Sequence, residues 1–229
     1  MGSYTPAHYY DCREKPLRLI VIHTMEAPES PKTAENIAAY FASGNVVASA
    51  HACVDQDSVV VCLPPSDTAF AAPGANADGY QIEHAGYASQ NDAGWADAES
   101  QSMLRLSAAH ARAIALAAGI PLRHLSDAEL AAGAAGFVGH DQVSRVYKRS
   151  DHWDPGTDFP WDQYMGLVNN GEEDTEETLI VQEEDTMHFV KSAQTNTIFA
   201  VTPTDVVAIG SSKLWGDLVK AYGLSNSYE

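Results

Sequence analysis

One loop in the second half of the chain concentrates residues that could bind a metal ion. Residues 150–161 read SDHWDPGTDFPW. Pro155 favours an extended backbone at Asp154, and Pro155-Gly156 predicts a tight turn directly after it. A carboxylate held on such a rigid corner is oriented in advance, which lowers the entropic cost of binding a metal. An isolated Asp-Pro-Gly sequence more often forms only an Asx turn, so a metal site needs further ligands elsewhere in the chain.

Two histidines at the ends of apolar runs are the candidates for those ligands. His23 ends LIVIH, and His140 ends GFVGH, where Gly139 has no side chain to block a close approach. A single histidine of this kind is more often a hydrogen-bonded core residue. If the two strands are neighbours, however, both rings lie over one point. A hydrolytic zinc site needs three histidine or carboxylate ligands and an open position for water, and His23, His140 and Asp154 would meet that need.

The elements that must position these residues alternate between strands and helices. Apolar runs and turn signals predict strands over 17–24, 79–87 and 136–143, a hairpin over 48–63, and helices over 31–43, 98–120 and 161–170. Gly119 and Pro121 are expected to stop the long helix. Because the hairpin must be antiparallel, we expect an α/β fold with a mixed central β-sheet flanked by helices.

The chain changes character after Asn170. Residues 171–185, GEEDTEETLIVQEED, carry repelling carboxylates and little to bury, which is typical of an acidic linker. The remaining residues, 186–229, contain the short alternating stretches MHFVKS, NTIFAVT and VVAIGSS and a helical KLWGDLVKAYG. We therefore predict a catalytic domain over 1–170, a linker over 171–185 and a small β-rich C-terminal module over 186–229.

Charge and composition restrict the partners. The 229-residue chain has a formal net charge of −18, which argues against nucleic acid or an anionic membrane as a partner. It has no apolar run of 18 residues, and its first 23 residues do not have the pattern of a signal peptide. Of the cysteines, Cys53 and Cys62 flank the hairpin turn and could form a cross-strand disulfide, but buried reduced thiols are favoured for all three, including Cys12.

Five ordered motifs carry a resemblance to a known family. The segments IVIHT, SAHACVDQDS, YQIEHAG, GFVGH and HWDPGTDFPW resemble, in order and spacing, those of the zinc-dependent N-acetylmuramoyl-L-alanine amidases (type 2), whose fold is shared with peptidoglycan recognition proteins. The pattern is most similar to endolysins of phages that infect actinobacteria. The resemblance covers roughly residues 4–168, so the C-terminal module lies outside it.

The resemblance implies roles for individual residues. His23, His140 and Asp154 are expected to bind zinc (Zn2+). Glu83, in QIEH, stands at the position of the glutamate that accepts a proton from the attacking water. His152 stands where relatives carry a lysine or histidine that stabilises the oxyanion and the leaving group; alternatively it is only a surface-loop partner of Trp153.

Other residues in these motifs have weaker expectations. His51 lies in SAH, where some relatives carry Tyr-His; Ala50 replaces that tyrosine, which leaves more of the proton handling to Glu83. His84 is expected either to support a metal ligand or to line the cleft, and Asp151 to be solvated or to orient a ligand. The aromatic residues of the loop are expected to pack beneath it rather than to stack on sugar: Trp153, Phe159 and Trp161.

The resemblance implies a phage endolysin that hydrolyses the amide between N-acetylmuramic acid and L-alanine in bacterial peptidoglycan and so lyses the host cell wall. We expect a monomer in the host cytoplasm before lysis and at the host wall afterwards, with the C-terminal module binding the wall. One alternative is a non-catalytic peptidoglycan-binding protein, but such relatives usually lack the third ligand, and here Asp154 is present. Another is a zinc peptidase that cuts within the stem peptide.

Overall fold

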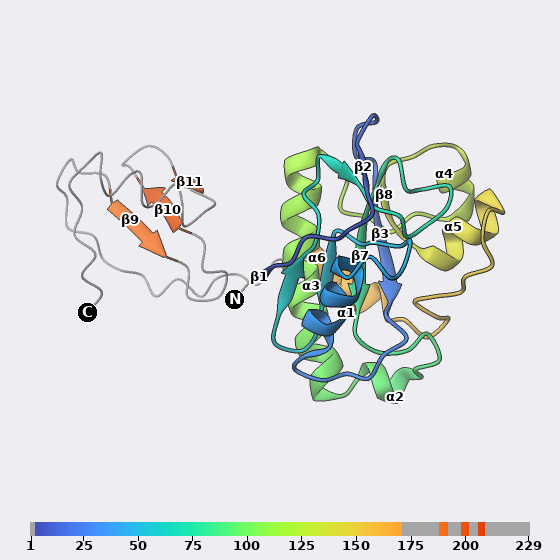
Figure 1. The fold of residues 1–229 in the computed structure, drawn as a ribbon, viewed down its shortest axis with the longest axis horizontal. Helices are drawn as coiled ribbons and strands as arrows, with labels where there is room; N and C mark the ends of the chain where they lie inside the picture. The colour runs from blue at the N-terminus through green and yellow to red at the C-terminus, as the bar shows by residue number, and fades with distance from the viewer. Residues whose placement is uncertain (1–2, 171–187, 192–197, 202–205, 209–229) are drawn as a thin grey trace. The chain divides into compact units, whose positions relative to one another are not determined.

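The structure is a computed structural model that describes residues 3–170, 188–191, 198–201 and 206–208. These residues fall into two compact units, one formed by residues 3–170 and the other by the three short segments (Figure 1). None of the described helices is both long and apolar enough to cross a membrane.

The first unit is built on a six-stranded sheet, and this sheet is mixed, as predicted. Its strands, in spatial order, are β1 (Ser3–Tyr4), β5 (Val59–Val61), β4 (Ala52–Val54), β7 (Gly79–His84), β3 (Leu19–Thr24) and β8 (Gly136–Gly139). β3 is parallel to both β7 and β8, whereas β4 and β5 form the predicted antiparallel hairpin. A separate two-stranded pair joins β2 (Asp11–Cys12) to β6 (Asp67–Thr68). β3 is paired with a strand on each edge and covered by helices on both faces, which explains why all six of its residues are buried.

Helices cover both faces of this sheet (Figure 1). α3 (Ala98–Ala118) and α6 (Trp161–Asn170) pack on the face that carries Ile20 and Ile22. On the opposite face, α1 (Thr33–Ala42) covers the β4–β5 end, and α4 (Asp127–Ala131) and α5 (His140–Tyr147) cover the β3–β8 end. The short helix α2 (Asp92–Trp95) lies between β7 and α3 in the chain. Figure 1 shows α3 on one side of the unit and α4 and α5 on the other.

The ends of the long helix follow from its sequence. Asp97 caps α3 by accepting a hydrogen bond from the backbone N–H of Ser100 at 2.8 Å. Gly119 ends the helix in the left-handed conformation with φ 69°, as its position predicted.

The predicted strand over 136–143 is wrong in its second half. β8 ends at Gly139, and His140 begins α5. The side-chain Oε1 of Gln142 accepts the backbone N–H of Gly139 at 3.0 Å, which caps the start of a helix. Val143 and Val146 are spaced to lie on one face of this helix, and both pack against the sheet.

The cysteines are free, but not all are buried. Cys53 and Cys62 are buried with their sulfurs 3.9 Å apart and form no disulfide. Cys12 is exposed on β2, so the expectation of a buried thiol is wrong there, because β2 belongs to a two-stranded pair and not to the central sheet.

The second unit contains three short antiparallel strands, β9 (His188–Lys191), β10 (Ile198–Val201) and β11 (Val206–Ala208). They coincide with the three alternating stretches of the sequence. The predicted acidic linker at 171–185 and the predicted helix at 213–223 lie outside the described residues.

Candidate metal centre

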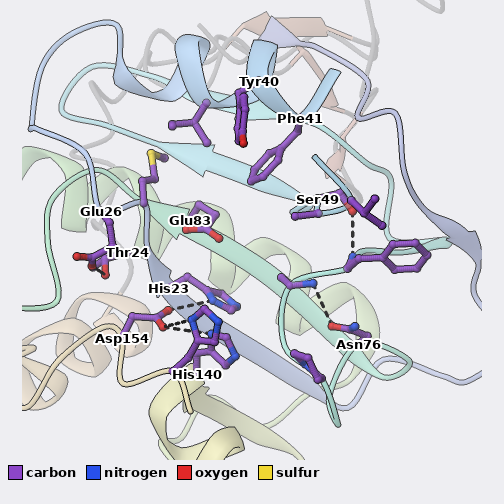
Figure 2. Close-up of a pocket in the computed structure, with 18 residues that line it drawn as sticks. His23, Thr24, Glu26, Tyr40, Phe41, Ser49, Asn76, Glu83, His140 and Asp154 are labelled. Atoms are coloured by element: carbon purple, nitrogen blue, oxygen red, sulfur yellow. Dashed lines mark hydrogen bonds and ion pairs between the residues drawn. The ribbon is translucent and has the colours of Figure 1, made fainter. Parts of the chain in front are cut away.

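The sheet brings the two candidate histidines together from distant parts of the chain. β3 lies between β7 and β8, and Ile22 pairs with Gly139. His23 and His140 therefore follow paired positions on neighbouring strands, and their rings lie 4.7 Å apart between centroids. Figure 2 shows both side chains directed toward Asp154. The expectation that adjacent strands place both rings over one point is confirmed.

Glycines allow the Asp154 loop to approach this point. Gly156 has φ 95°, and a Cβ added there would lie 1.9 Å from the carbonyl oxygen of Ala88. A Cβ on Gly139 would lie 2.9 Å from Cδ of Pro155. The backbone N–H of Asp141 also donates to the carbonyl oxygen of Asp154 at 2.8 Å. The loop is thus held against both β8 and the segment after β7, with Asp154 buried.

The spacing of the three side chains fits one tetrahedral ion. Nδ1 of His23 lies 3.1 Å from Oδ2 of Asp154, and Nδ1 of His140 lies 3.2 Å from Oδ1. One donor atom from each residue lies within 4.8 Å of the others. Ligand atoms that surround a tetrahedral zinc ion at about 2.0–2.1 Å lie about 3.3 Å from one another. Two imidazole nitrogens and a carboxylate at this spacing are a suitable donor set for a divalent transition metal.

The charges of the three residues are strongly coupled. Burial lowers the pKa of His23, but the carboxylates of Glu83 and Asp154 outweigh it and raise that pKa to about 9. Burial lowers the pKa of His140 to about 4. Burial opposes ionisation of Asp154, but hydrogen bonds from His140 and His23 hold the pKa of Asp154 well below its usual range. Asp154 is therefore an anion at neutral pH.

Glu83 lies beside this cluster with an unused carboxylate oxygen. It pairs with His23 in the register of β3 and β7. Among the described residues, its Oε2 is shielded from solvent and has no hydrogen-bond partner. Burial disfavours the charged form and raises the pKa of Glu83 to about 7, against the lowering effect of His23. A carboxyl group with a pKa near neutrality can both accept and return a proton.

His152 lies at the open side of the cluster. Its ring stacks on His140, with centroids 4.4 Å apart and an interplanar angle of 17°. Its Nδ1 is 3.5 Å from Oδ1 of Asp154, and 60% of its side chain is exposed. His152 therefore stands next to the three candidate ligands, within reach of solvent and of a bound molecule.

The aromatic residues of the loop differ in how deeply they are buried. Phe159 is buried and packs edge-on against Trp95, as expected for a residue beneath the loop. Trp161 is partly buried and stacks on His124 with ring centroids 3.7 Å apart. Trp153 is 55% exposed, so the prediction that it packs beneath the loop is wrong. Its neighbours His152 and Asp154 both face the cluster, which leaves the Trp153 side chain outside.

His84 supports a ligand and does not line the cleft. Its Nδ1 lies 3.0 Å from the carbonyl oxygen of His23, and therefore donates to it. Its Nε2 accepts from Oγ of Ser107 at 2.6 Å, and Ser107 in turn contacts the Tyr164 hydroxyl at 2.8 Å. This buried chain of hydrogen bonds ties the backbone of His23 to α3 and α6.

His51 lies away from the groove, in the core. It is fully buried, and its Nδ1 accepts the backbone N–H of Gln81 at 2.9 Å. Burial lowers the pKa of His51 to about 3, so its ring is neutral at physiological pH. Asp151 lies in the loop of residues 150–161, called the metal loop below, and is exposed, as expected for a solvated carboxylate.

A groove of about 500 Å³ leads to the cluster. One wall comes from α1, through Ile37, Tyr40 and Phe41, and Figure 2 shows Glu83 between this wall and His23. These three residues lie on the helix predicted over 31–43, for which the sequence indicated no role in the site. Glu26 and Asn76 also line the groove, and no motif had marked either of them. None of the described residues that line it is a lysine or arginine.

The comparison with protein families decides the assignment. The sequence model described as N-acetylmuramoyl-L-alanine amidase matches residues 13–157, which contain the His23–His140–Asp154 cluster and Glu83. The chain belongs to the N-acetylmuramoyl-L-alanine amidase family. It is therefore an enzyme whose family acts on peptidoglycan, and the buried cluster is its candidate zinc site. The family match and the complete ligand set favour the enzyme over the non-catalytic alternative.

Solved structures share the amidase fold at low sequence identity. Staphylococcus aureus hydrolase AmiA is 19% identical with a TM-score of 0.59, over 73% of this chain and 80% of AmiA. The PlyG catalytic domain is 15% identical with a TM-score of 0.51, over 77% and 98% of the two chains. AmpD is 19% identical with a TM-score of 0.50, over 73% and 94%. No curated protein matches the sequence of this chain. At these identities the likeness extends to the fold alone.

Proposed function

We propose that this amidase is a phage endolysin that uses zinc to hydrolyse the amide bond between N-acetylmuramic acid and L-alanine. The observation that carries the proposal is the orphan Oε2 of Glu83 beside the buried His23–His140–Asp154 cluster. The cluster supplies three ligands, and Glu83 supplies a group that can act as an acid or a base. No other described residue forms a hydrogen bond with its Oε2. The endolysin assignment rests on the five ordered motifs and on nothing in the fold.

His23, His140 and Asp154 would hold the ion. Two neutral imidazoles and one carboxylate leave a net positive charge at a divalent metal. When bound, zinc supplies a Lewis acid that lowers the pKa of a bound water to about 7. The burial of the three ligands excludes competing waters from their side of the site.

Glu83 would transfer the proton. As the water oxygen bonds to the amide carbon, Glu83 takes the proton that the water loses. When the bond between carbon and nitrogen breaks, Glu83 returns that proton to the nitrogen of L-alanine. The products are the free lactyl carboxylate of the sugar and a stem peptide with a free amino end.

His152 would stabilise the negative charge that develops on the carbonyl oxygen. It lies at the exposed edge of the cluster, where its ring can donate a hydrogen bond to a bound substrate without a rearrangement of the loop at residues 150–161. The groove beside α1 would hold the stem peptide, because it is continuous with Glu83 and the ligand cluster.

Zinc analysis combined with product analysis tests this proposal. Purified protein should contain about one zinc per chain, and digested walls should release intact stem peptides that begin with L-alanine. A zinc peptidase would instead release fragments cut within the stem, which mass spectrometry distinguishes. Stem fragments without intact peptides, or a protein that binds no zinc, would refute the proposed activity.

The C-terminal residues 186–229 would direct the enzyme to the wall. A monomer made in the host cytoplasm and released at lysis fits an endolysin, and wall binding by a separate unit would keep it on its substrate. Deletion of residues 171–229 should weaken binding to purified actinobacterial walls by at least tenfold while soluble muramyl peptides are still cleaved. Unchanged wall binding would exclude this role.

A further inference from the structure

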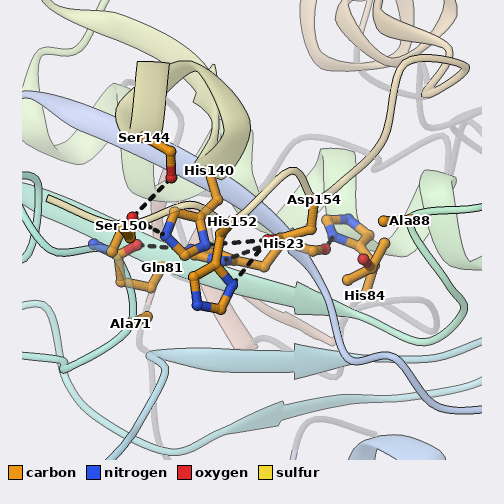
Figure 3. Close-up of polar contacts among 12 residues, drawn as sticks. His23, Ala71, Gln81, His84, Ala88, His140, Ser144, Ser150, His152 and Asp154 are labelled. Atoms are coloured by element: carbon orange, nitrogen blue, oxygen red, sulfur yellow. Dashed lines mark hydrogen bonds and ion pairs between the residues drawn. The ribbon is translucent and has the colours of Figure 1, made fainter. Parts of the chain in front are cut away.

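The imidazole of His23 is held from both sides. Its Nδ1 faces Asp154 within the ligand cluster, and its Nε2 lies 2.9 Å from Oε1 of Gln81 (Figure 3). Gln81 is fully buried on β7, two residues before Glu83, so both side chains project from the same face of the sheet. The motif YQIEHAG, which contains Gln81, indicated no role for it.

The orientation of the Gln81 amide is determined by a second contact. Its Nε2 donates to the carbonyl oxygen of Ala75 at 3.1 Å. The amide oxygen must then face His23, and an amide oxygen can only accept a hydrogen bond. Nε2 of His23 is therefore a donor. Once a metal replaces the proton that Nδ1 donates to Asp154, the remaining proton of the neutral ring stays on Nε2, and the lone pair is on Nδ1, the atom that faces the metal cluster.

The residues around Gln81 make room for its contact with Ala75 and hold Ala75 in place. A Cβ on Gly79 would lie 2.6 Å from Nε2 of Gln81 and 2.5 Å from the Ala75 carbonyl oxygen, so only glycine leaves room for this contact. The loop that presents Ala75 is held by Asn76, whose Oδ1 accepts the backbone N–H groups of Ala71 and Ala72 at 3.1 and 2.6 Å. Gln81 thus links a rigid loop to one metal ligand.

The other histidine lacks such a partner. Nε2 of His140 lies 3.4 Å from Oγ of Ser150, which contacts Oγ of Ser144 at 2.7 Å (Figure 3). A hydroxyl group can donate or accept, so this longer contact does not select one tautomer. Control of the tautomer is therefore concentrated at His23.

We propose that Gln81 is a positioning residue that keeps His23 in the Nε2–H tautomer and fixes its ring, so that Nδ1 is free to bind the metal. This inference rests on the proposed zinc site. Partners of this kind typically change metal affinity by about 10–100-fold when they are removed. Gln81 touches neither the metal position nor the groove, so it acts through His23.

Zinc affinity measured by competition with a chelator tests the proposal. Gln81→Met removes the acceptor at similar volume and should weaken zinc binding about 10–100-fold. Gln81→Glu keeps an acceptor oxygen and should bind zinc within about threefold of wild type. This change in zinc affinity is much smaller than the one expected for Gln81→Met, which loses the acceptor. Tyr80→Phe is the matched control, because it removes a part-buried hydrogen bond to His110 from the preceding residue of β7, on the opposite face of the sheet.

Nitrogen-15 NMR of the imidazole rings gives a readout that a general loss of stability would not move. In zinc-loaded wild type, the proton of His23 should reside on Nε2 with a downfield shift typical of a hydrogen bond, and Gln81→Met should lose that shift. Wild-type affinity in Gln81→Met, an equal loss in Tyr80→Phe, or an equal loss in Gln81→Glu would each overturn the role of Gln81. Failure of wild type to bind zinc would instead refute the proposed zinc site itself.

Discussion

His23 and Glu83 occupy paired positions on the parallel strands β3 and β7. Paired residues of neighbouring strands project from the same face of a sheet, so a candidate ligand and an unpartnered carboxylate stand side by side over one groove. The backbone of β3, a fully buried strand paired on both edges, holds this arrangement, and it does not depend on a mobile loop.

Glu83→Gln should abolish catalysis and keep the metal. The amide matches the carboxyl group in size but cannot accept and return a proton, so turnover should fall by about 10²–10⁴-fold. Zinc content should stay at the wild-type level, because Glu83 is not a member of the ligand cluster. Hydrolysis of a soluble muramyl peptide and elemental analysis on the same sample check both parts. Activity within tenfold of wild type would assign the proton transfer to another group.

Asp154→Ala should remove the metal together with the activity. The variant leaves only two histidine ligands, fewer than the three that zinc hydrolases use. Asp151→Ala provides the matched control, since Asp151 is an exposed aspartate of the same loop. We expect zinc and lysis to be lost in the first variant and retained in the second. Full zinc occupancy in Asp154→Ala would exclude Asp154 as a ligand.

His152→Gln should slow the chemical step without releasing zinc. Loss of one donor to a developing oxyanion typically lowers kcat by about 10²–10³-fold. The exposed position of His152 means that stability should change little. Steady-state kinetics with a muramyl peptide, together with zinc analysis, distinguish the two effects. If only KM rose, His152 would contribute to substrate binding alone.

Gly156→Ala should disrupt the metal loop. The added Cβ would lie 1.9 Å from the carbonyl oxygen of Ala88 at a backbone φ of 95°, so the turn must shift and Asp154 with it. Gly166→Ala in α6 is the control: no atom lies within 4 Å of the added Cβ, and helix propensity should stabilise the protein by up to about 1 kcal/mol. Chemical denaturation and zinc titration measure both variants. Tight zinc binding by Gly156→Ala would contradict the close approach.

His51 should make stability depend on pH. Its pKa is lowered by burial to about 3 in the folded protein, whereas an unfolded histidine titrates near 6.5. Between these values the unfolded chain binds the extra proton, so the contribution of His51 to stability is lost as pH falls from about 6.5 toward 3, by up to about 1.4 kcal/mol per pH unit. Unfolding free energies of wild type and His51→Gln, measured with chelator from pH 7 to 4, should converge as pH falls. Parallel pH profiles would show that His51 does not titrate in this way.

The sequence by itself determined most of the local elements and singled out the candidate site residues. The apolar run before His23 predicted β3, Gly119 predicted the end of α3, and the hairpin required a mixed sheet. These features depend on a residue and its near neighbours, through backbone conformation and the periodicity of burial. The local pattern predicted a strand at residues 140–143, and this was wrong. There the capping contact of Gln142 and packing against the sheet stabilise a helix.

Only the tertiary structure decided which residues meet. The order of strands β7, β3 and β8 brings Asp154 to His23 across 131 positions of sequence, and Gln81 to the other edge of the same ring across 58. The exposure of Trp153, the groove wall of α1 and the burial of His51 have the same origin. A contact between distant residues depends on strand order and register, which arise from the packing of the whole core and leave no mark on a local stretch of sequence.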